Sequence, residues 1–176
     1  MQRHFSVSEG LGVLLQASYI QIRPAALSWA ISVKHKVKEH FHGLWIRGEL
    51  VAKVKEHLQS AEEFYALGAK EFEEGRRKGD LTRMREGCEK VFHAYVEATA
   101  ALIQKRGFPE PESHGERWEI LDKMGRSAFI EVGDSAFLYL HQYGYYGGKI
   151  RPEVEKTMKA VKEVIEQVHK ETVHES

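Results

Sequence analysis

His114, Arg117 and Trp118 are spaced like side chains that share a function at the start of a helix. They fall three and four residues apart, so they lie on one face of that helix near its N-terminus. Free backbone N–H groups, the positive end of the helix dipole and a planar guanidinium all favour negative charge there. The three residues are therefore a candidate anion or phosphate site. In the competing interpretation the tryptophan packs into the core, the arginine pairs with Glu110 or Glu112, and the histidine caps the helix.

A second candidate group lies further along the chain and consists of His141, Tyr143, Tyr145 and Tyr146. An imidazole in an otherwise apolar helix can act as an acid or base near neutral pH, or hydrogen-bond a ligand. The tyrosine rings can stack on a nucleic-acid base, because every base presents a π-face. A buried core histidine and a tyrosine packing corner or dimer contact are the alternatives.

Metal and cofactor chemistry lack a recognisable pattern. His35, His40 and His42 are close in sequence, but no cysteine or carboxylate completes the three or four ligands that zinc needs at fixed spacing. Cys88 is the single cysteine and lies on an apolar stripe, which makes it a core residue. Neither a Gly-rich phosphate loop nor a Ser/His/Asp set occurs. We expect no metal, no cofactor and no catalytic residue.

The overall charge gives no preference for nucleic acid or membrane. Lysine plus arginine total 26, as do aspartate plus glutamate, so no global field attracts a polyanion. A local basic group either meets phosphates or forms a solvated loop; it consists of Arg76, Arg77, Lys78, Arg83 and Arg85. No apolar run approaches the roughly 20 residues that span a bilayer, and the N-terminus lacks a signal-peptide pattern. We expect a cytoplasmic protein without membrane contact.

Two apolar stripes at helical spacing predict a helical hairpin over residues 49–106. The stripes are Val51, Val54, Leu58, Ala61, Tyr65, Gly68 and Phe72, then Met84, Cys88, Val91, Tyr95, Ala98 and Leu102. Alternating steps of three and four residues are typical of helices packed side by side. The short connection at residues 75–80 makes the two helices antiparallel, and Asp80 is placed to cap the second.

Three further helices follow a proline-containing break. A capping box of Ser113 and Glu116 starts a helix that ends near Gly125. The next helix spans about residues 127–146, and Pro152 opens the last one. The sequence thus predicts an all-α fold: an antiparallel up-and-down helical bundle over residues 49–170, followed by a frayed tail at 171–176.

Residues 1–48 are expected to form an N-terminal extension of mixed structure. Ile31, Val33 and Val37 alternate like a strand, whereas Ala30, Val33 and Val37 also fit a helix. The apolar content of the extension requires burial, either on the bundle or through self-association.

Several short motifs follow one another in the bundle in a distinctive order. They are Glu73-Glu74-Gly75 and Lys78-Gly79-Asp80, Lys105-Arg106-Gly107, Ser113-His114 followed by Trp118, Ala136 and Leu140-His141 before the tyrosines, and Pro152-Glu153-Val154. With this order and spacing, residues 49–168 resemble the HEPN superfamily of small helical bundles, most closely its archaeal PaREP-type branch. The resemblance implies an antiparallel helical bundle that is commonly dimeric.

The resemblance also implies a set of activities. HEPN relatives bind nucleotides, accompany minimal nucleotidyltransferases, or act as ribonucleases in toxin–antitoxin and defence systems. The ribonucleases use an arginine followed four to six residues later by a histidine. Here seven residues separate Arg85 from His93 and Arg106 from His114, which speaks against nuclease chemistry. The tyrosines also stand where the PaREP-type branch would have an asparagine and a glutamate.

Three functional hypotheses follow. The first is a non-catalytic HEPN-like protein, expected to be a homodimer, which binds a nucleotide, RNA or partner protein through His114, Arg117, Trp118, His141 and the three tyrosines. It would belong to a toxin–antitoxin or nucleotidyltransferase-associated system. The second is a metal-independent ribonuclease with His141 as acid or base and Arg117 or Arg126 stabilising the phosphate. The third is a structural homo-oligomeric interaction protein that associates through residues 1–48.

Overall fold

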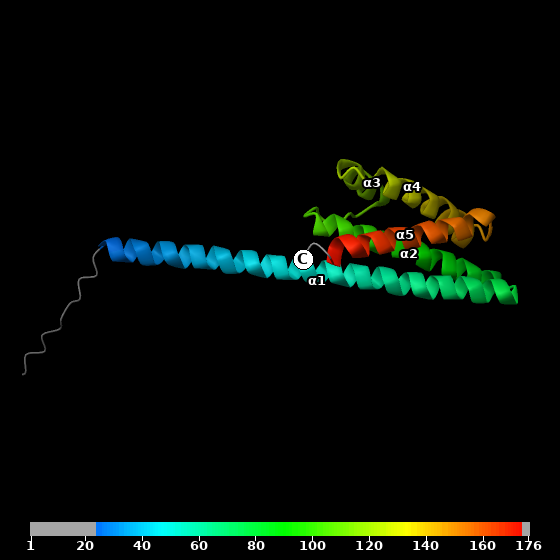
Figure 1. Ribbon diagram of the computed structural model, residues 1–176, viewed down its shortest axis with the longest axis horizontal. Coiled ribbons are helices and arrows are strands. Elements are labelled where there is room, and N and C mark those ends of the chain that lie inside the picture. Colours follow the sequence, from blue (N-terminus) through cyan, green and yellow to red (C-terminus); the bar gives the residue numbers. More distant parts are fainter. Residues whose placement is uncertain (1–23, 174–176) are drawn as a thin grey trace, which may run out of the picture. The chain divides into compact units, whose positions relative to one another are not determined.

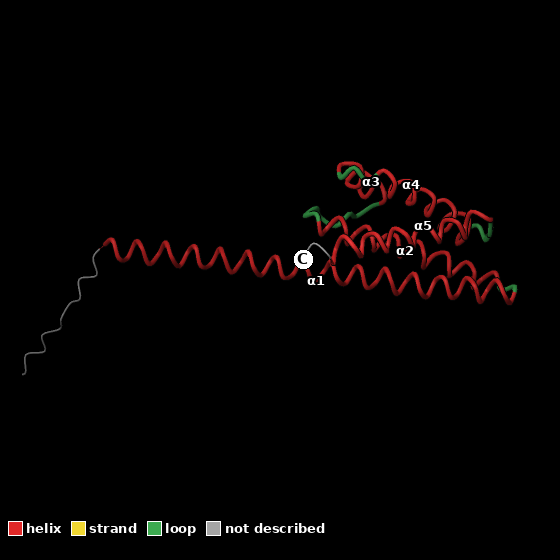
Figure 2. The backbone as a smooth tube through the Cα atoms, in the orientation of Figure 1, coloured by secondary structure: helices red, strands yellow, loops and turns green. Residues whose placement is uncertain are grey.

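Every regular element of the chain is a helix in the part that the computed structural model describes (Figure 2). The structure describes the backbone of residues 24–173 and the side chains of residues 48–172. The elements are α1 (Pro24–Lys78), α2 (Leu81–Lys105), α3 (His114–Lys123), α4 (Ser127–Ser135), the π-helix η1 (Ala136–Tyr146) and α5 (Pro152–Val173). The predicted all-α helical bundle is confirmed.

The N-terminal extension differs from the prediction. Residues 24–48 belong to α1, so the helical alternative is correct for them and mixed structure is wrong. Pro24 begins the helix at the position where its fixed φ and missing N–H are tolerated. The chain divides into two units between His42 and Gly43, and the bundle described below belongs to the second unit. Residues 1–23 and the side chains of His35, His40 and His42 lie outside the described residues.

The predicted hairpin of α1 and α2 is confirmed together with its cap. Helix α1 continues through Gly75 to Lys78, and Gly79 then turns the chain with a φ of 67°. Asp80 caps α2, because its side chain accepts a hydrogen bond from the backbone N–H of Arg83 at 3.1 Å. The two helices approach closely at Gly87, where an added Cβ would lie 2.6 Å from the Gly68 carbonyl oxygen.

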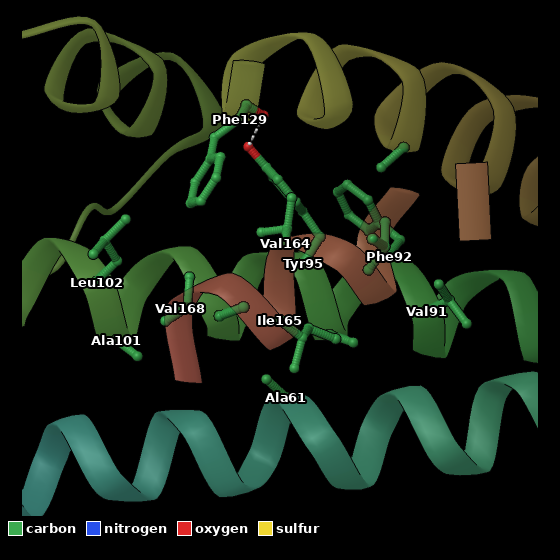
Figure 3. Packing of buried hydrophobic residues seen from close by; sticks show 14 of the residues in the cluster. Ala61, Val91, Phe92, Tyr95, Ala101, Leu102, Phe129, Val164, Ile165 and Val168 are labelled. Carbon is green, nitrogen blue, oxygen red and sulfur yellow. Dashed lines mark hydrogen bonds between the residues drawn. The ribbon is translucent and has the colours of Figure 1, made fainter. Parts of the chain in front are cut away.

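Within the second unit, α2 and α5 form a central layer. Helix α2 packs against α5, η1 and α3, and α5 also contacts η1 and α4 (Figure 1). Figure 3 shows side chains of α2 and α5 meeting between Ala61 of α1 and Phe129 of α4. The two predicted apolar stripes supply much of this core, and α5 adds further residues to it. Its fully buried members include Ala61, Phe72, Cys88, Val91, Tyr95, Ala98, Leu102, Val154, Val161 and Val168. Val51 is an exception, because 61% of its surface is exposed.

The last three predicted helices are also present, with two differences. Ser113 caps α3 by accepting from the Glu116 N–H at 3.1 Å, as the capping box predicts. The helix predicted at 127–146 is α-helical only to Ser135 and continues as a π-helix to Tyr146. Helix α5 runs to Val173, so residues 171–173 are helical rather than frayed, and residues 174–176 of the predicted tail lie outside the described residues. Glu171 is held there because its carboxylate accepts hydrogen bonds from Arg106 and Arg126 at 2.9 and 2.5 Å.

Candidate binding site

A glutamate on α2 lies between two histidines from different helices. The Nδ1–H of His141, on η1, donates to Glu89 Oε2 at 2.7 Å, and His93 Nε2 lies 3.3 Å from Glu89 Oε1. A carboxylate only accepts hydrogen bonds, so this arrangement assigns the proton of His141 Nδ1 and directs its Nε2 away from Glu89. The side chains of Glu89 and His141 are 17% and 16% exposed, whereas that of His93 is 49% exposed.

These contacts shift the pKa values of Glu89 and His93. Burial raises the pKa of Glu89, but hydrogen bonds and charges from His93 and His141 outweigh burial and leave this pKa below its ordinary value. The contact with Glu89 raises the pKa of His93 despite partial burial. The carboxylate therefore stays ionised, and His93 holds its proton to a higher pH than a free histidine does.

Phe92 is the aromatic centre around which the histidines gather. Its ring stacks on His141 with centroids 4.6 Å apart and lies 5.3 Å from the ring of His114, on α3. Phe137, on η1, closes the group at 5.4 Å from His114 and 5.5 Å from His141. We call Glu89, Phe92, His93, His114, Phe137 and His141 the histidine cluster.

His114 differs electrostatically from His93. Burial beside the aromatic rings lowers its pKa, and the positive charges of Arg117, His141 and His93 lower it further. One histidine of the cluster therefore favours the neutral form while another favours the protonated form. Opposite pKa shifts in one group of side chains are a feature of sites where protons are transferred or charged ligands bind.

Two tyrosines extend the histidine cluster towards solvent. Tyr146 meets the His141 ring edge-on at 4.9 Å and is 63% exposed. Tyr145 packs against Tyr146 at 5.0 Å, and its backbone carbonyl accepts a 2.6 Å hydrogen bond from Arg85 Nε. An exposed aromatic ring thus lies beside an imidazole and near a guanidinium.

The π-helix and a close helix contact place His141 opposite Glu89. An added Cβ on Gly144 would lie 2.9 Å from Cys88 Sγ, so only glycine allows η1 to approach α2 this closely. Cys88 precedes Glu89 on α2, and His141 lies one turn before Gly144 on η1. Short π-helical segments are rare and occur frequently at functional sites.

The structure brings together four of the seven predicted site residues: His114, His141, Tyr145 and Tyr146. Tyr143 instead contacts Tyr139 and Arg151, the Arg151 guanidinium lying 4.5 Å from its ring centre. Trp118 is half-buried and makes no ring contact within the described residues. The charge of Arg117 lowers the pKa of His114, but Arg117 itself is only 5% exposed.

Arg117 does not form the ion pair with Glu110 or Glu112 that the competing interpretation requires. Within the side chains that the structure describes it has no ion-pair partner, and its buried Nε atom has no hydrogen-bond acceptor. Arg126, the other arginine of the ribonuclease hypothesis, binds Glu171 and lies over the Phe129 ring at 5.6 Å. Sequence reasoning overlooked Glu89 and considered Arg85 and His93 only as basic residues or as a nuclease pair, although the spacing of four residues places all three on one face of α2.

A second polar group lies on the C-terminal half of α2, beyond the histidine cluster. His57 Nδ1 donates to Glu97 Oε2 at 2.7 Å, and this bond raises the pKa of His57 although burial opposes it. Gln104 Nε2 donates to Glu110 Oε2 at 3.1 Å. The group joins α1 to α2 and to the loop before α3, and within the described residues the buried Oε1 atom of Gln104 has no hydrogen-bond partner.

Metal binding and membrane insertion find no support in the described residues. No three or more His, Cys, Asp or Glu side chains among them are arranged to hold a metal ion. In the same part of the chain, no helix combines the length and apolarity needed to cross a membrane.

Comparison with known proteins gives no match: no protein-family model fits the chain, and no curated protein or solved structure is similar to it. The resemblance to HEPN bundles therefore stays a prediction from sequence motifs.

Proposed function

We propose that the protein binds a nucleotide or single-stranded RNA over the histidine cluster, without needing a metal. The observation that carries this proposal is the meeting of three imidazoles, from α2, α3 and η1, around Phe92 and Glu89, with Tyr146 exposed beside them. Core packing does not require ionisable rings, and each buried one costs desolvation. A stacked base and its phosphate would use both the rings and the protonatable nitrogens.

The stacking surface is tested with two matched substitutions. Tyr146→Leu removes the exposed ring beside His141, and Tyr143→Leu makes the same change in the same helix outside the histidine cluster. Base–aromatic stacking contributes about 1–3 kcal/mol per base. We therefore expect Tyr146→Leu to weaken RNA binding about 5-fold to 150-fold in fluorescence anisotropy, and Tyr143→Leu to weaken it less than about twofold. Equal affinity of both variants and the unmodified protein would exclude the proposed surface.

A metal-independent ribonuclease is the second candidate, and the opposite pKa shifts of His114 and His93 favour it. Neutral His114 would accept the proton of a ribose 2′-hydroxyl as this oxygen attacks the adjacent phosphorus. Protonated His93 would give a proton to the departing 5′-oxygen. Such an enzyme would leave 2′,3′-cyclic phosphate ends, resist chelators and lose activity in His114→Asn. RNA that stays intact over days at micromolar protein removes this candidate while leaving binding untouched.

We further propose that the chain is a HEPN-like homodimer that acts with a nucleotidyltransferase or another toxin–antitoxin partner. The order of the helices and the turn between α1 and α2 support the proposed relationship to HEPN bundles. A mainly apolar cavity of about 260 Å³ offers a surface for self-association; it is lined by Leu50, Val51, Val54 and Leu58, with Lys55, Lys105 and Thr172. Light scattering tests the homodimer, and Val51→Glu should then yield monomers with unchanged helix content. A monomer at high concentration in the unmodified protein would contradict it.

A further inference from the structure

Four of the five histidines whose side chains the structure describes contact a carboxylate. The pairs are His57 with Glu97 at 2.7 Å, His93 and His141 with Glu89 at 3.3 and 2.7 Å, and His169 with Glu62 at 2.6 Å. His114 is the exception within this part of the chain, since its contacts are the rings of Phe92 and Phe137. Among these five histidines an imidazole is thus normally matched by an acid, and that of His114 is not.

Arg117, one turn further along α3, is unmatched in the same way. It is 5% exposed, makes no ion pair with the side chains that the structure describes, and leaves its buried Nε without an acceptor. Glu97, Glu110 and Glu116 act on it through space without reaching it. A buried guanidinium with an unused N–H is costly, and an anionic ligand would supply the missing acceptor.

The two unmatched bases belong to the first turns of one helix. Helix α3 has ten residues and begins at His114, so its positive end coincides with the imidazole. Two cationic side chains and a helix N-terminus together are the elements from which proteins build phosphate sites. Here the unpartnered Arg117 is an observation independent of the helix start.

We propose that His114, Arg117 and the first turn of α3 form the subsite that binds the phosphate group of the ligand. This inference rests on the proposed function, because it assigns one part of the nucleotide or RNA to one part of the site. The phosphate oxygens would accept from the Arg117 guanidinium and from a protonated His114. The base would then lie towards His141 and Tyr146.

Binding at this subsite requires a proton. In the free protein His114 favours its neutral form because of its burial, and the groups facing it are cationic or basic: Arg117 on its own helix, His93 on α2 and His141 on η1. Glu89 is already held by the last two histidines. A bound phosphate would supply the missing negative charge and raise the pKa of His114. Affinity should therefore fall as the pH rises from 5.5 to 8, and binding near pH 6.5 should take up a proton.

The test is calorimetric titration of the full chain with inorganic phosphate, AMP and adenosine at pH 6.5, in two buffers of different ionisation enthalpy. His114→Asn removes the proton-binding ring, and His114→Phe keeps the ring contacts with Phe92 and Phe137 if the asparagine variant fails to fold. His169→Asn is the matched control, since this histidine lies with Glu62 outside the histidine cluster. We expect AMP to bind more tightly than adenosine and the binding enthalpy to depend on the buffer. His114 variants should bind phosphate and AMP about tenfold or more weakly, and the His169 variant within twofold.

The outcomes separate this inference from the proposed function. If adenosine and AMP bind equally, or if the His114 variants bind phosphate as the unmodified protein does, the phosphate subsite is wrong while base binding stands. If the buffer dependence of the binding enthalpy is the same in His114→Asn as in the unmodified protein, the exchanged proton belongs to the phosphate, whose second pKa is about 6, and the role of His114 is excluded. If neither AMP nor adenosine nor a short RNA binds, both proposals fall.

Discussion

Replacing Glu89 by Gln tests the electrostatic centre of the histidine cluster. The substitution keeps the size of the side chain and removes the charge that two imidazoles contact. A hydrogen bond to a charged group contributes about 1.5–3 kcal/mol. The bond from His141 is largely buried, whereas His93 is half-exposed and solvent screens its contribution. We therefore expect the free energy of unfolding to fall by about 2 kcal/mol at pH 6. For a chain of this size that corresponds to about 4–8 °C in melting temperature.

The pH dependence of this loss has a definite sign. The lowered pKa of Glu89 contributes stability that is present above the carboxyl's unfolded value and lost as the pH falls through the folded value. The raised pKa of His93 contributes stability that is present below about 6.5 and lost as the pH rises through the folded value. The difference between the two proteins should therefore be largest between about pH 5 and 6.5 and shrink towards pH 8.5.

Urea denaturation at pH 6 and 8.5, followed by circular dichroism, measures both quantities. Glu86→Gln is the matched control, because Glu86 lies on the same helix, is 51% exposed and, among the described side chains, has a single ion-pair contact, with Lys90 at 4.0 Å. It should change the free energy of unfolding by less than about 0.5 kcal/mol. A Glu89→Gln variant as stable as this control, or one whose loss is the same at both pH values, would refute the assignment of Glu89 as the centre of the cluster.

Three further predictions concern the scaffold. Gly144→Ala should destabilise the protein by about 1–3 kcal/mol in urea denaturation, because the new methyl group would overlap Cys88 Sγ, 2.9 Å away. Asp80→Ala should lower the free energy of unfolding by about 1 kcal/mol through loss of the cap on Arg83 N–H, and Asp80→Asn should retain most of it. Burial raises the pKa of the Cys88 thiol to about 12, so a thiol reagent at pH 8 should label it only after unfolding; rapid labelling of the folded protein would contradict the packing of η1 on α2.

The helices of the bundle could be predicted because their signals are local. The apolar stripes of α1 and α2 repeat at helical spacing, and the caps at Asp80 and Ser113 involve residues three apart in the chain. The extension of α1 to Pro24 was harder to predict, because its apolar residues fit two periods. Nor did the sequence predict the π-helix. Hydrogen bonds in a π-helix join residues five apart in the chain, whereas those in an α-helix join residues four apart. No pattern of residue types distinguishes the two.

The candidate site could be predicted only in part. Its residues on α3 and η1 stand out as polar or aromatic groups in otherwise apolar surroundings. Glu89 and His93 on α2 do not, because charged residues beside an apolar stripe are typical of a solvated helix face. Their role depends on a contact with His141, 52 residues from Glu89, which only the packing of η1 on α2 creates. The burial of Arg117 without an ion pair likewise depends on tertiary structure.

The most direct test of ligand binding at the histidine cluster is NMR of the imidazole C–H signals during titration with a short single-stranded RNA. Single His→Gln variants assign the signals. We predict that the C–H signals of His93, His114 and His141 shift together and saturate with one dissociation constant, while the signal of His169 does not move. Unchanged signals for the three cluster histidines, with or without a shift of His169, would contradict it.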